Sequence, residues 1–304
     1  IQEFPIVFKQ PDVAGVTHAT VKANGIDVHV ARAGAGKPLV LLHGWPEFWY
    51  VWHKVVPLLA DRYELIMPDL RGFGATEKPS KGKSDQNGAP IRSEDLAALA
   101  DALGLDTFGL VSHDVGSLIA QVFAREHSER LAGLFFFNCV HPGIGSRWLV
   151  PEHLAEIWYQ SFQQKDWAAE LIGHSRDTCR IYLKNMLAHW AHDDHAFAPD
   201  LEIWVDNFMA PGNLQGGFNW YVSANAARLA VMKGQAPQLP PIETPTFILW
   251  GRHDPVIKAE WSDTVGAHFT DATVEIAEDA GHFVHYETPE LAARKIAAFF
   301  ADRG

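Results

Sequence analysis

Short, continuous apolar runs alternate along the chain with segments whose apolar residues recur at helical spacing. The continuous runs predict strands that are buried on both faces at residues 38–42, 63–67, 108–111, 131–137 and 246–250. Helical spacing predicts helices over 93–103, 117–125, 259–265 and 290–300, with a further strand near 274–276. Strands that alternate with helices in this order predict a doubly wound, mostly parallel sheet of the α/β class.

The N-terminal part of the chain predicts a hairpin. After a tail, alternating runs at 17–22 and 26–31 meet at Asn24-Gly25, a pair that favours the tight turn between two antiparallel strands. Further along, a loop rich in Lys, Ser and Gly precedes the helix that we expect to begin near Ser93, whose hydroxyl suits a helix N-cap.

A long helical block interrupts the alternation of strands and helices. From residue 141 to about residue 233 the pattern is helical and rich in Trp and His, and a linker that contains several prolines follows it. We therefore predict a core made of residues 1–140 and 241–304, with residues 141–240 inserted as a helical cap. The natural place for this cap is over the ends of the strands.

The composition limits the class of protein. Of the 304 residues, 47% are hydrophobic and 20% are charged, which is enough apolar material for a large core. A formal net charge of -12 without a cluster of Lys and Arg argues against a nucleic-acid partner. We see no apolar stretch that is long enough to cross a bilayer, so we expect no membrane partner.

The cysteine content adds an expectation about the compartment. Cys139 and Cys179 are too few for a disulfide framework, and their spacing does not match a metal site. A reducing compartment, the cytoplasm, is therefore the expected location. The sequence does not decide the oligomeric state, so both a monomer and a homodimer remain as alternatives.

The segment around Asp114 predicts a sharp turn between a strand and a helix. The strand expected at 108–111 runs toward Asp114, and helical spacing begins soon after it. In a nucleophile elbow, small residues two places before and two places after the tip let the strand and the helix pack closely. Ser112 and Gly116 occupy these places, so Asp114 is expected at the tip.

An aspartate at the tip implies a different chemistry from that of the usual serine. A serine that attacked a saturated carbon would form an ether, which water does not cleave, whereas an aspartate forms an ester that an activated water hydrolyses. The expected nucleophile is therefore Asp114, and the expected target is an sp3 carbon that bears a leaving group.

Two further residues complete a catalytic set in the chain order nucleophile, acid, histidine. Asp254 follows the strand expected at 246–250, and His282 lies in the loop before the last helix. We expect His282 to be the general base for the hydrolytic water and Asp254 to hold its tautomer and offset its transient charge. Taken singly, either residue is more typical of a turn or a solvated loop, but the order of all three favours catalysis.

Five motifs give the chain a resemblance to a known family: His43-Gly44-Trp45-Pro46, Asp69-Leu70-Arg71-Gly72-Phe73-Gly74, His113-Asp114-Val115-Gly116, Gly251-Arg252-His253-Asp254 and Gly281-His282-Phe283. With these motifs the chain resembles the α/β-hydrolases of the group that contains the epoxide hydrolases and the haloalkane and haloacetate dehalogenases. The resemblance implies an α/β-hydrolase fold with a cap and no cofactor. It also implies an oxyanion hole formed by the backbone N–H groups of Trp45 and Val115.

The leaving group separates the branches of this group, because an epoxide oxygen leaves as an alkoxide and needs an acid, whereas a halide needs only N–H donors. Epoxide hydrolases resemble one another in using two cap tyrosines as that acid. Tyr221, in Phe218-Asn219-Trp220-Tyr221, closely resembles the second tyrosine motif, and Tyr159, in Trp158-Tyr159-Gln160-Ser161-Phe162, resembles the first over a shorter stretch. An unperturbed phenol has a pKa of about 10, so both would first donate hydrogen bonds to the oxygen. A third tyrosine of this segment, Tyr182, is expected to be core.

The dehalogenase branches match less well beside the nucleophile. Haloalkane dehalogenases carry a Trp there, and haloacetate dehalogenases carry arginines there and three places further, whereas this chain has Val115 and Leu118. A small, neutral, apolar epoxide is therefore the expected substrate, and the candidate pocket walls, which suit plain core equally well, are Trp45, Trp158, Phe162 and Trp220. A dehalogenase of the same fold and a non-catalytic binding protein of that fold remain as alternatives.

Three other features are interpreted as structural. His189, His192 and His195 lie in one stretch but do not match a zinc-binding helix, so we expect a solvated loop and no metal. His113 flanks the tip of the elbow, where side chains usually point away from the site. The segment Gly72-Phe73-Gly74 lacks a dinucleotide fingerprint, and the proposed chemistry needs no cofactor.

Overall fold

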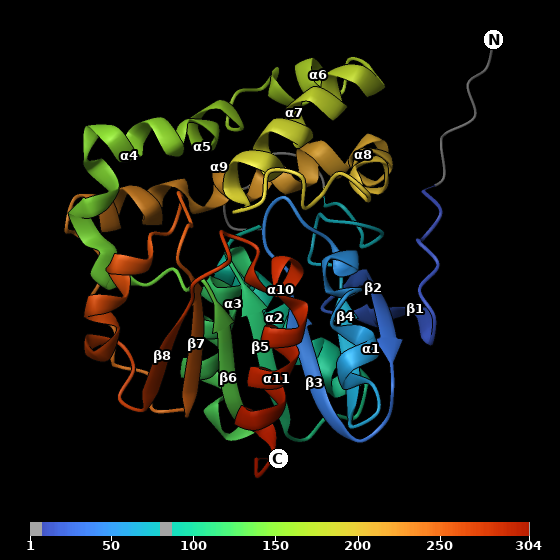
Figure 1. Cartoon of the computed structure of the whole chain (residues 1–304), viewed down its shortest axis with the longest axis vertical. Coiled ribbons are helices and arrows are strands. Elements are labelled where there is room, and N and C mark those ends of the chain that lie inside the picture. The colour runs from blue at the N-terminus through green and yellow to red at the C-terminus, as the bar shows by residue number, and fades with distance from the viewer. Residues whose placement is uncertain (1–7, 80–86, 304) are drawn as a thin grey trace.

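A central eight-stranded sheet organises the computed structural model, which describes residues 8–79 and 87–303 (Figure 1). The strands are β1 (Val16–Ala23), β2 (Ile26–Ala33), β3 (Lys37–Leu42), β4 (Tyr63–Pro68), β5 (Phe108–His113), β6 (Leu131–Phe137), β7 (Thr246–Gly251) and β8 (Ala272–Ala277). Their order in the sheet is β1-β2-β4-β3-β5-β6-β7-β8. The pairs β1–β2 and β2–β4 are antiparallel and the other pairs are parallel, so the predicted, mostly parallel sheet is confirmed.

Helices cover both faces of this sheet. Those outside the block between β6 and β7 are η1 (Trp49–Trp52), α1 (Val56–Leu59), α2 (Ala89–Ala102), α3 (Val115–Glu126), η3 (Ser128–Arg130), η5 (Ala259–Ala267), α10 (Val284–Glu287) and α11 (Pro289–Phe300), where η denotes a 3-10 helix. In Figure 1, α1 and α11 lie in front of the sheet, and α2 and α3 lie behind it. This arrangement is the doubly wound architecture expected for parallel strands.

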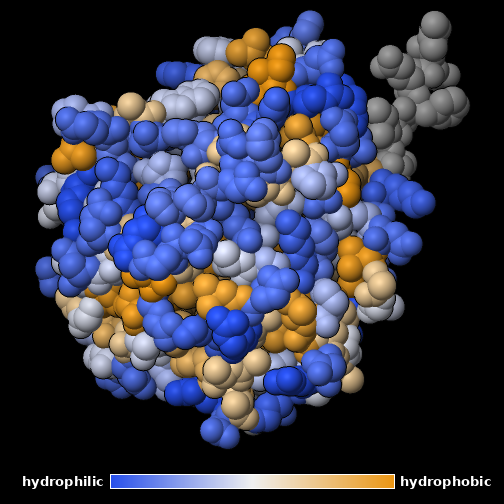
Figure 2. Space-filling model, in the orientation of Figure 1, coloured by the Kyte–Doolittle hydropathy of each residue, from blue (hydrophilic) through white to orange (hydrophobic). Residues whose placement is uncertain are grey.

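The remaining helices form a layer of their own. They are η4 (Pro142–Leu149), α4 (Pro151–Glu156), α5 (Trp158–Phe162), α6 (Ala168–Ile172), α7 (Arg176–Trp190), α8 (Leu201–Met209) and α9 (Asn213–Met232). Figure 1 shows this helical layer above the sheet. Its outer surface exposes apolar side chains such as Leu171 and Ile181, and Figure 2 shows hydrophobic atoms at the top of the face, where α6 lies.

The predicted hairpin and buried strands are confirmed. Asn24 and Gly25 have φ values of 44° and 77°, as the tight turn between antiparallel strands requires. In the middle of the sheet every residue of β5 is buried, and Leu110 and Phe136 are wholly inaccessible. Continuous apolar runs therefore mark strands with helices on both faces.

Some boundaries differ from the prediction. Helix α2 begins at Ala89 and not near Ser93, because Pro90 suits the first helical turn and Ser93 is buried within the helix, where its Oγ donates to Glu126 Oε2 at 3.2 Å. The helix expected at 259–265 is a 3-10 helix, and the short η1, α1 and α10 were not predicted.

Parts of two predicted segments lie outside the described residues. They are the start of the N-terminal tail, residues 1–7, and residues 80–86 of the loop rich in Lys, Ser and Gly. Within the described ranges, no helix combines the length and the apolar character that crossing a membrane requires.

Candidate active site

Asp114 occupies a tight turn between β5 and α3. Its φ of 46° and ψ of -114° are strained for a residue with a side chain. The surrounding backbones approach so closely that a Cβ at Gly116 would lie 2.6 Å from Leu42 O, and one at Gly44 would lie 2.5 Å from Asp114 Cβ. This packing holds the aspartate at the end of the sheet, below the helical layer.

The Asp114 carboxylate faces a backbone donor and a histidine. Its Oδ1 accepts a hydrogen bond from the backbone N–H of Trp45 at 3.0 Å, and its Oδ2 lies 3.8 Å from His282 Nε2. Val115 is the first residue of α3, so its N–H has no acceptor within the helix. Of the two backbone groups expected in an oxyanion hole, that of Trp45 contacts the carboxylate and that of Val115 is not used within the helix.

His282 forms its shortest side-chain contact with Asp254. The distance from His282 Nδ1 to Asp254 Oδ2 is 2.8 Å, and both side chains are fully buried. Burial opposes the charged imidazolium, but Asp254 and, more weakly, Asp114 raise the pKa of His282 to about 9. Among the described residues His282 Nε2 has no hydrogen-bond partner, so this nitrogen is free to act on a water or a substrate.

Asn138, which the sequence analysis missed, holds Asp254 from the end of β6. Its Nδ2 donates to Asp254 Oδ2 at 2.6 Å, and its Oδ1 accepts from the backbone N–H of Gly251 at 2.8 Å. The backbone N–H groups of Val256 and Ile257 donate to Asp254 Oδ1 at 2.7 and 2.9 Å. Four donors therefore surround this carboxylate once His282 is included. The sequence did contain a signal for this role, because Asn138 is a polar residue directly after the apolar run of β6.

A second buried group, Glu47, lies behind the histidine. Its Oε1 is 2.9 Å from His113 Nδ1 and 3.5 Å from His285 Nε2, and His113 Nε2 donates to His282 O at 2.8 Å. Burial opposes the carboxylate, but the two histidines hold the pKa of Glu47 well below its usual value. His113 thus points away from the reaction site and supports the backbone of His282.

Trp190, at the end of α7, joins the helical layer to the histidine loop. Its carbonyl oxygen accepts from the backbone N–H of His282 at 2.8 Å, and a Cβ at Gly281 would lie 2.5 Å from the same oxygen. Its ring lies 5.2 Å from that of His282 and 4.8 Å from that of Tyr159, centroid to centroid. Trp190 therefore packs between the candidate base and one of the candidate acids.

The structure brings the two predicted tyrosines together. Tyr159 on α5 and Tyr221 on α9 are both buried, and their rings are 5.6 Å apart and nearly perpendicular. Burial raises the pKa of both phenols above the usual value, so both are protonated hydrogen-bond donors. By contrast, Tyr182 accepts a hydrogen bond from Gln163 Nε2 at 2.7 Å within the helical layer.

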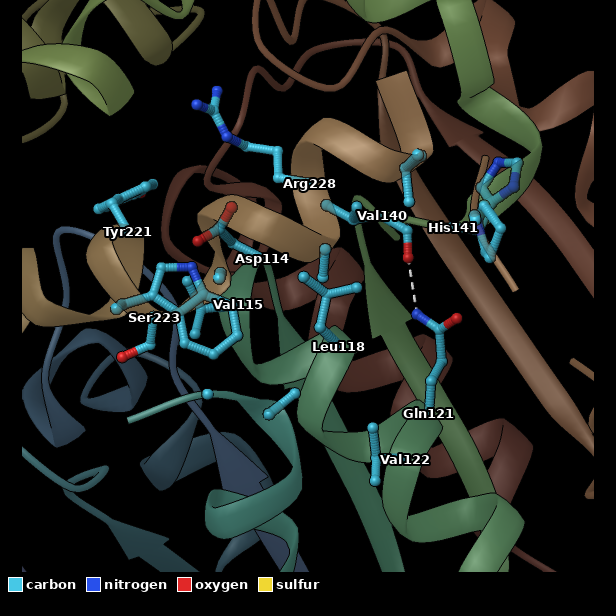
Figure 3. A pocket seen from close by; sticks show the side chains of 18 of the residues that line it. Asp114, Val115, Leu118, Gln121, Val122, Val140, His141, Tyr221, Ser223 and Arg228 are labelled. Carbon is cyan, nitrogen blue, oxygen red and sulfur yellow. Dashed lines mark hydrogen bonds between the residues drawn. The ribbon is translucent and has the colours of Figure 1, made fainter. Parts of the chain in front are cut away.

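Asp114 and the two tyrosines line one cavity of about 750 Å³ (Figure 3). The core side of this cavity is the face of α3 that bears Leu118 and Val122, and the other side includes Trp148 and Trp220. In Figure 3, Arg228 lies above the Asp114 carboxylate and Tyr221 lies to its left. Most of the lining is apolar, which suits a largely apolar ligand.

Three of the four predicted walls do not line this cavity. Trp158 is 50% exposed and packs against Phe162 and Tyr182, with which it forms an aromatic cluster of the helical layer. Phe162 belongs to the same cluster. Trp45 packs beneath the cavity against Phe218 and Tyr221. Trp220 is the one predicted wall found in the lining, because the face of a helix that meets a cavity depends on how the helices pack, which an aromatic motif does not reveal.

The histidines singled out in the sequence do not converge. His189 pairs with Glu156, whereas the ring of His192 stacks on that of His253. Of the described residues, only Glu47, His113 and His285 bring three potential metal-binding atoms within 4.8 Å of one another, and all three side chains are buried.

Comparison with known proteins gives a consistent set of similarities. The family model described as alpha/beta hydrolase fold matches residues 37–289. A soluble epoxide hydrolase of Corynebacterium sp. (strain C12) is 31% identical over 296 residues, which cover 94% of this chain and 98% of the relative. Epoxide hydrolase 2 of Siraitia grosvenorii is 40% identical over 239 residues, 69% of this chain and 73% of the relative. The solved structure of the epoxide hydrolase CorEH without ligand has a TM-score of 0.83 and 28% identity, and the match covers 94% of this chain and 99% of that one.

Proposed function

The chain belongs to the α/β-hydrolase fold family and, within it, to the epoxide hydrolases, and from this premise we propose that it opens an epoxide to a vicinal diol through an ester on Asp114. The observation that carries the proposal is the single cavity lined by Asp114, Tyr159 and Tyr221. A carboxylate nucleophile and a pair of neutral phenolic donors are the two functions that the opening of an epoxide requires.

In the first step, an oxygen of Asp114 attacks one carbon of the epoxide ring. The bond between this carbon and the epoxide oxygen breaks, and its electron pair passes to the oxygen. The oxygen takes the proton of one phenol, Tyr159 or Tyr221, which becomes a phenolate. The product of this step is a hydroxyalkyl ester of Asp114.

In the second step, His282 Nε2 removes a proton from water as the water oxygen attacks the ester carbonyl. The backbone N–H groups of Trp45 and Val115 stabilise the oxyanion that forms. As this intermediate collapses, the imidazolium gives its proton to the departing diol oxygen. The carboxylic acid left on Asp114 loses its proton, and the phenolate regains one.

The charges around His282 provide an order for these steps. With Asp114 ionised, the pKa of His282 is about 9, because burial is outweighed by the two carboxylates. Ester formation removes the charge of Asp114 and with it part of this support. Loss of the Asp114 charge therefore lowers the pKa of His282 and favours the neutral imidazole, the form that accepts a proton from water.

The substrate that fits this cavity best is a neutral, apolar epoxide. The cavity walls are mostly aliphatic and aromatic. The residue after the nucleophile, Val115, and the residue three places further, Leu118, offer neither a cation nor a side-chain halide donor. We propose further that residues 141–240 act as a cap over a core of residues 1–140 and 241–304. The relatives named above are epoxide hydrolases, so they favour neither a dehalogenase nor a non-catalytic binding protein.

One turnover in heavy-oxygen water tests the proposal. The enzyme is used in excess over an aryl or aliphatic epoxide, and the peptide that contains Asp114 is weighed by mass spectrometry afterwards. We expect one heavy oxygen in the Asp114 carboxylate, because water attacks the ester carbonyl. Diol that accumulates while this peptide stays unlabelled would contradict the ester mechanism, and halide release from haloacids without any diol would favour the dehalogenase.

A further inference from the structure

Arg228 is a half-buried cation on the cap side of the cavity, and the two steps above do not use it. It lies on α9 about two helical turns after Tyr221 and lines the cavity (Figure 3). Its guanidinium forms no salt bridge with any residue of the described ranges. It donates instead to two amide oxygens, Gln160 Oε1 at 2.6 Å and Asn225 Oδ1 at 2.9 Å.

These contacts decide the orientation of the Gln160 amide. A guanidinium has only donors, so the end of the amide that faces Arg228 is the acceptor, Oε1. The other end, Nε2, has only hydrogens to offer, and it donates to the Tyr159 hydroxyl oxygen at 3.2 Å. Arg228 therefore selects which end of an almost symmetric side chain meets the tyrosine.

A neighbouring glutamine holds the same network in place. Gln164 Nε2 donates to the backbone oxygen of Gln160 at 2.7 Å and to Asn225 Oδ1 at 3.3 Å. The polar side chains of α5 and α9 are thereby tied together behind Tyr159. In this arrangement, the Gln160 amide satisfies its contacts with both Arg228 and Tyr159 in only one orientation.

The orientation of Gln160 in turn directs the proton of Tyr159. Since the Tyr159 oxygen accepts from Gln160, its own O–H points away from Gln160 and is available to a second acceptor. Tyr159 is 2% exposed and shares the cavity with Asp114. In the proposed complex this second acceptor is the epoxide oxygen.

We propose that Arg228 and Gln160 are positioning residues for the tyrosine acid: Arg228 orients Gln160, and Gln160 aims the Tyr159 proton at the epoxide oxygen and stabilises the phenolate that forms. As negative charge develops on Tyr159, the hydrogen bond from Gln160 becomes charge-assisted, and the cation behind it polarises that bond further. The inference rests on the proposed function and concerns ester formation alone, since Tyr159 neither activates the water nor protonates the departing diol when the ester is hydrolysed.

The test measures ester formation in a His282→Gln background, where the ester accumulates and the mass of the quenched protein follows it. Arg228→Met removes the cation and keeps much of the side-chain length, and we expect ester formation to slow about 10- to 100-fold. Arg228→Lys, which also only donates, should retain most of the rate. In protein that keeps His282, the hydrolysis rate of the ester should be the same with Arg228→Met as without it.

Gln160→Glu provides an independent variant. A carboxylate still pairs with Arg228 but has no hydrogen to donate to Tyr159, so this change should slow ester formation as Arg228→Met does. A structural role would predict the opposite, because the added ion pair keeps the two helices together. Unchanged ester formation in Gln160→Glu would overturn the positioning role.

A double-mutant cycle with Tyr159→Phe completes the test. A phenyl ring accepts nothing from Gln160, so Arg228→Met should slow ester formation less than about twofold in that background. An equal slowing with and without the Tyr159 hydroxyl, or an equal slowing of ester formation and ester hydrolysis, would overturn the positioning role. If the His282→Gln protein itself forms no ester with any epoxide, the proposed function fails and this inference fails with it. If the ester forms and Arg228→Met leaves its rate unchanged, only the inference fails.

Discussion

His282 Nε2 lies 3.8 Å from Asp114 Oδ2, whereas its Nδ1 lies 2.8 Å from Asp254 Oδ2. The shorter contact orients the imidazole ring, and the longer one leaves Nε2 without a hydrogen-bond partner among the described residues. A water beside this nitrogen would be within reach of the carbonyl carbon of an ester on Asp114. The unequal distances support the proposed role of His282 as the base in ester hydrolysis.

The variant His282→Gln should separate the two steps. Glutamine is similar in size but takes up no proton, so we expect the ester to form and diol release to fall by about 10²- to 10⁴-fold. Intact-protein mass spectrometry should show a gain equal to the mass of the epoxide. The matched control is Asp114→Ala, which should gain no mass, and normal turnover by His282→Gln would show that the base is misidentified.

The hydrolysis of the ester should accelerate as the pH rises. In the free enzyme the pKa of His282 is about 9, because Asp254 and Asp114 together outweigh the effect of burial. The ester removes the charge of Asp114, which lowers this pKa, and only the neutral imidazole accepts a proton. The single-turnover rate of ester hydrolysis should therefore rise with pH to a plateau, and the midpoint of this rise should be an apparent pKa below 9. A rate that is flat or falls over this range would contradict the assignment.

Replacement of the two phenols should abolish diol formation. We expect Tyr159→Phe and Tyr221→Phe each to lower kcat by about 10²-fold or more, and the double variant to leave no measurable turnover, because the epoxide oxygen then leaves without an acid. The control is Tyr182→Phe, whose hydroxyl bonds to Gln163 away from the cavity and whose loss should leave kcat unchanged. Diol formation by the double variant at the normal rate would exclude the tyrosines as acids.

The amide of Asn138 should matter for both stability and catalysis. Asn138→Ala removes the bonds to Asp254 and Gly251 and places alanine at a φ of 47°, so we expect a loss of about 2–3 kcal/mol in the free energy of unfolding and a lower kcat. Asn138→Gly removes the same amide without the backbone strain. Denaturant titration of both variants separates the two contributions, and an Asn138→Ala protein as stable and active as the wild type would contradict the role of the amide.

The lining of the cavity should control the size of the substrate. Leu118→Trp adds bulk to the face of α3 inside the cavity, so it should raise the KM of large aryl epoxides more than that of small aliphatic ones. Trp158→Ala is the matched control, because this side chain is half exposed and lies outside the lining. Steady-state kinetics on both substrate classes test this, and equal effects of the two variants would show that the substrate binds elsewhere.

Much of the fold follows from local patterns that the sequence displays openly. The strand Leu131–Phe137 coincides with the predicted run, and the turn at Asn24-Gly25 has the expected backbone, because burial on both faces and a positive φ each demand particular residue types. The elbow and the chain order of Asp114, Asp254 and His282 are likewise visible, since each follows or precedes a recognisable element.

Local sequence patterns do not predict contacts between segments that are distant in the chain. Asn138 and Asp254 are far apart in the chain, and only the pairing of β6 with β7 brings their side chains together. At the start of α2, Pro90 in the first turn is a local signal, but the contact of the Ser93 hydroxyl with Glu126 on α3 is one that no local pattern encodes.

By itself the sequence determined the alternation of strands and helices, the carboxylate at the elbow and the identity of the residues available for catalysis. Only the tertiary structure decided that Trp158 faces outward while Trp220 lines the cavity, and that Arg228 and Gln160 meet behind Tyr159. The physical reason is that hydrophobic periodicity reports which face of a helix or strand is buried. The residues that this face contacts depend on how separate elements pack.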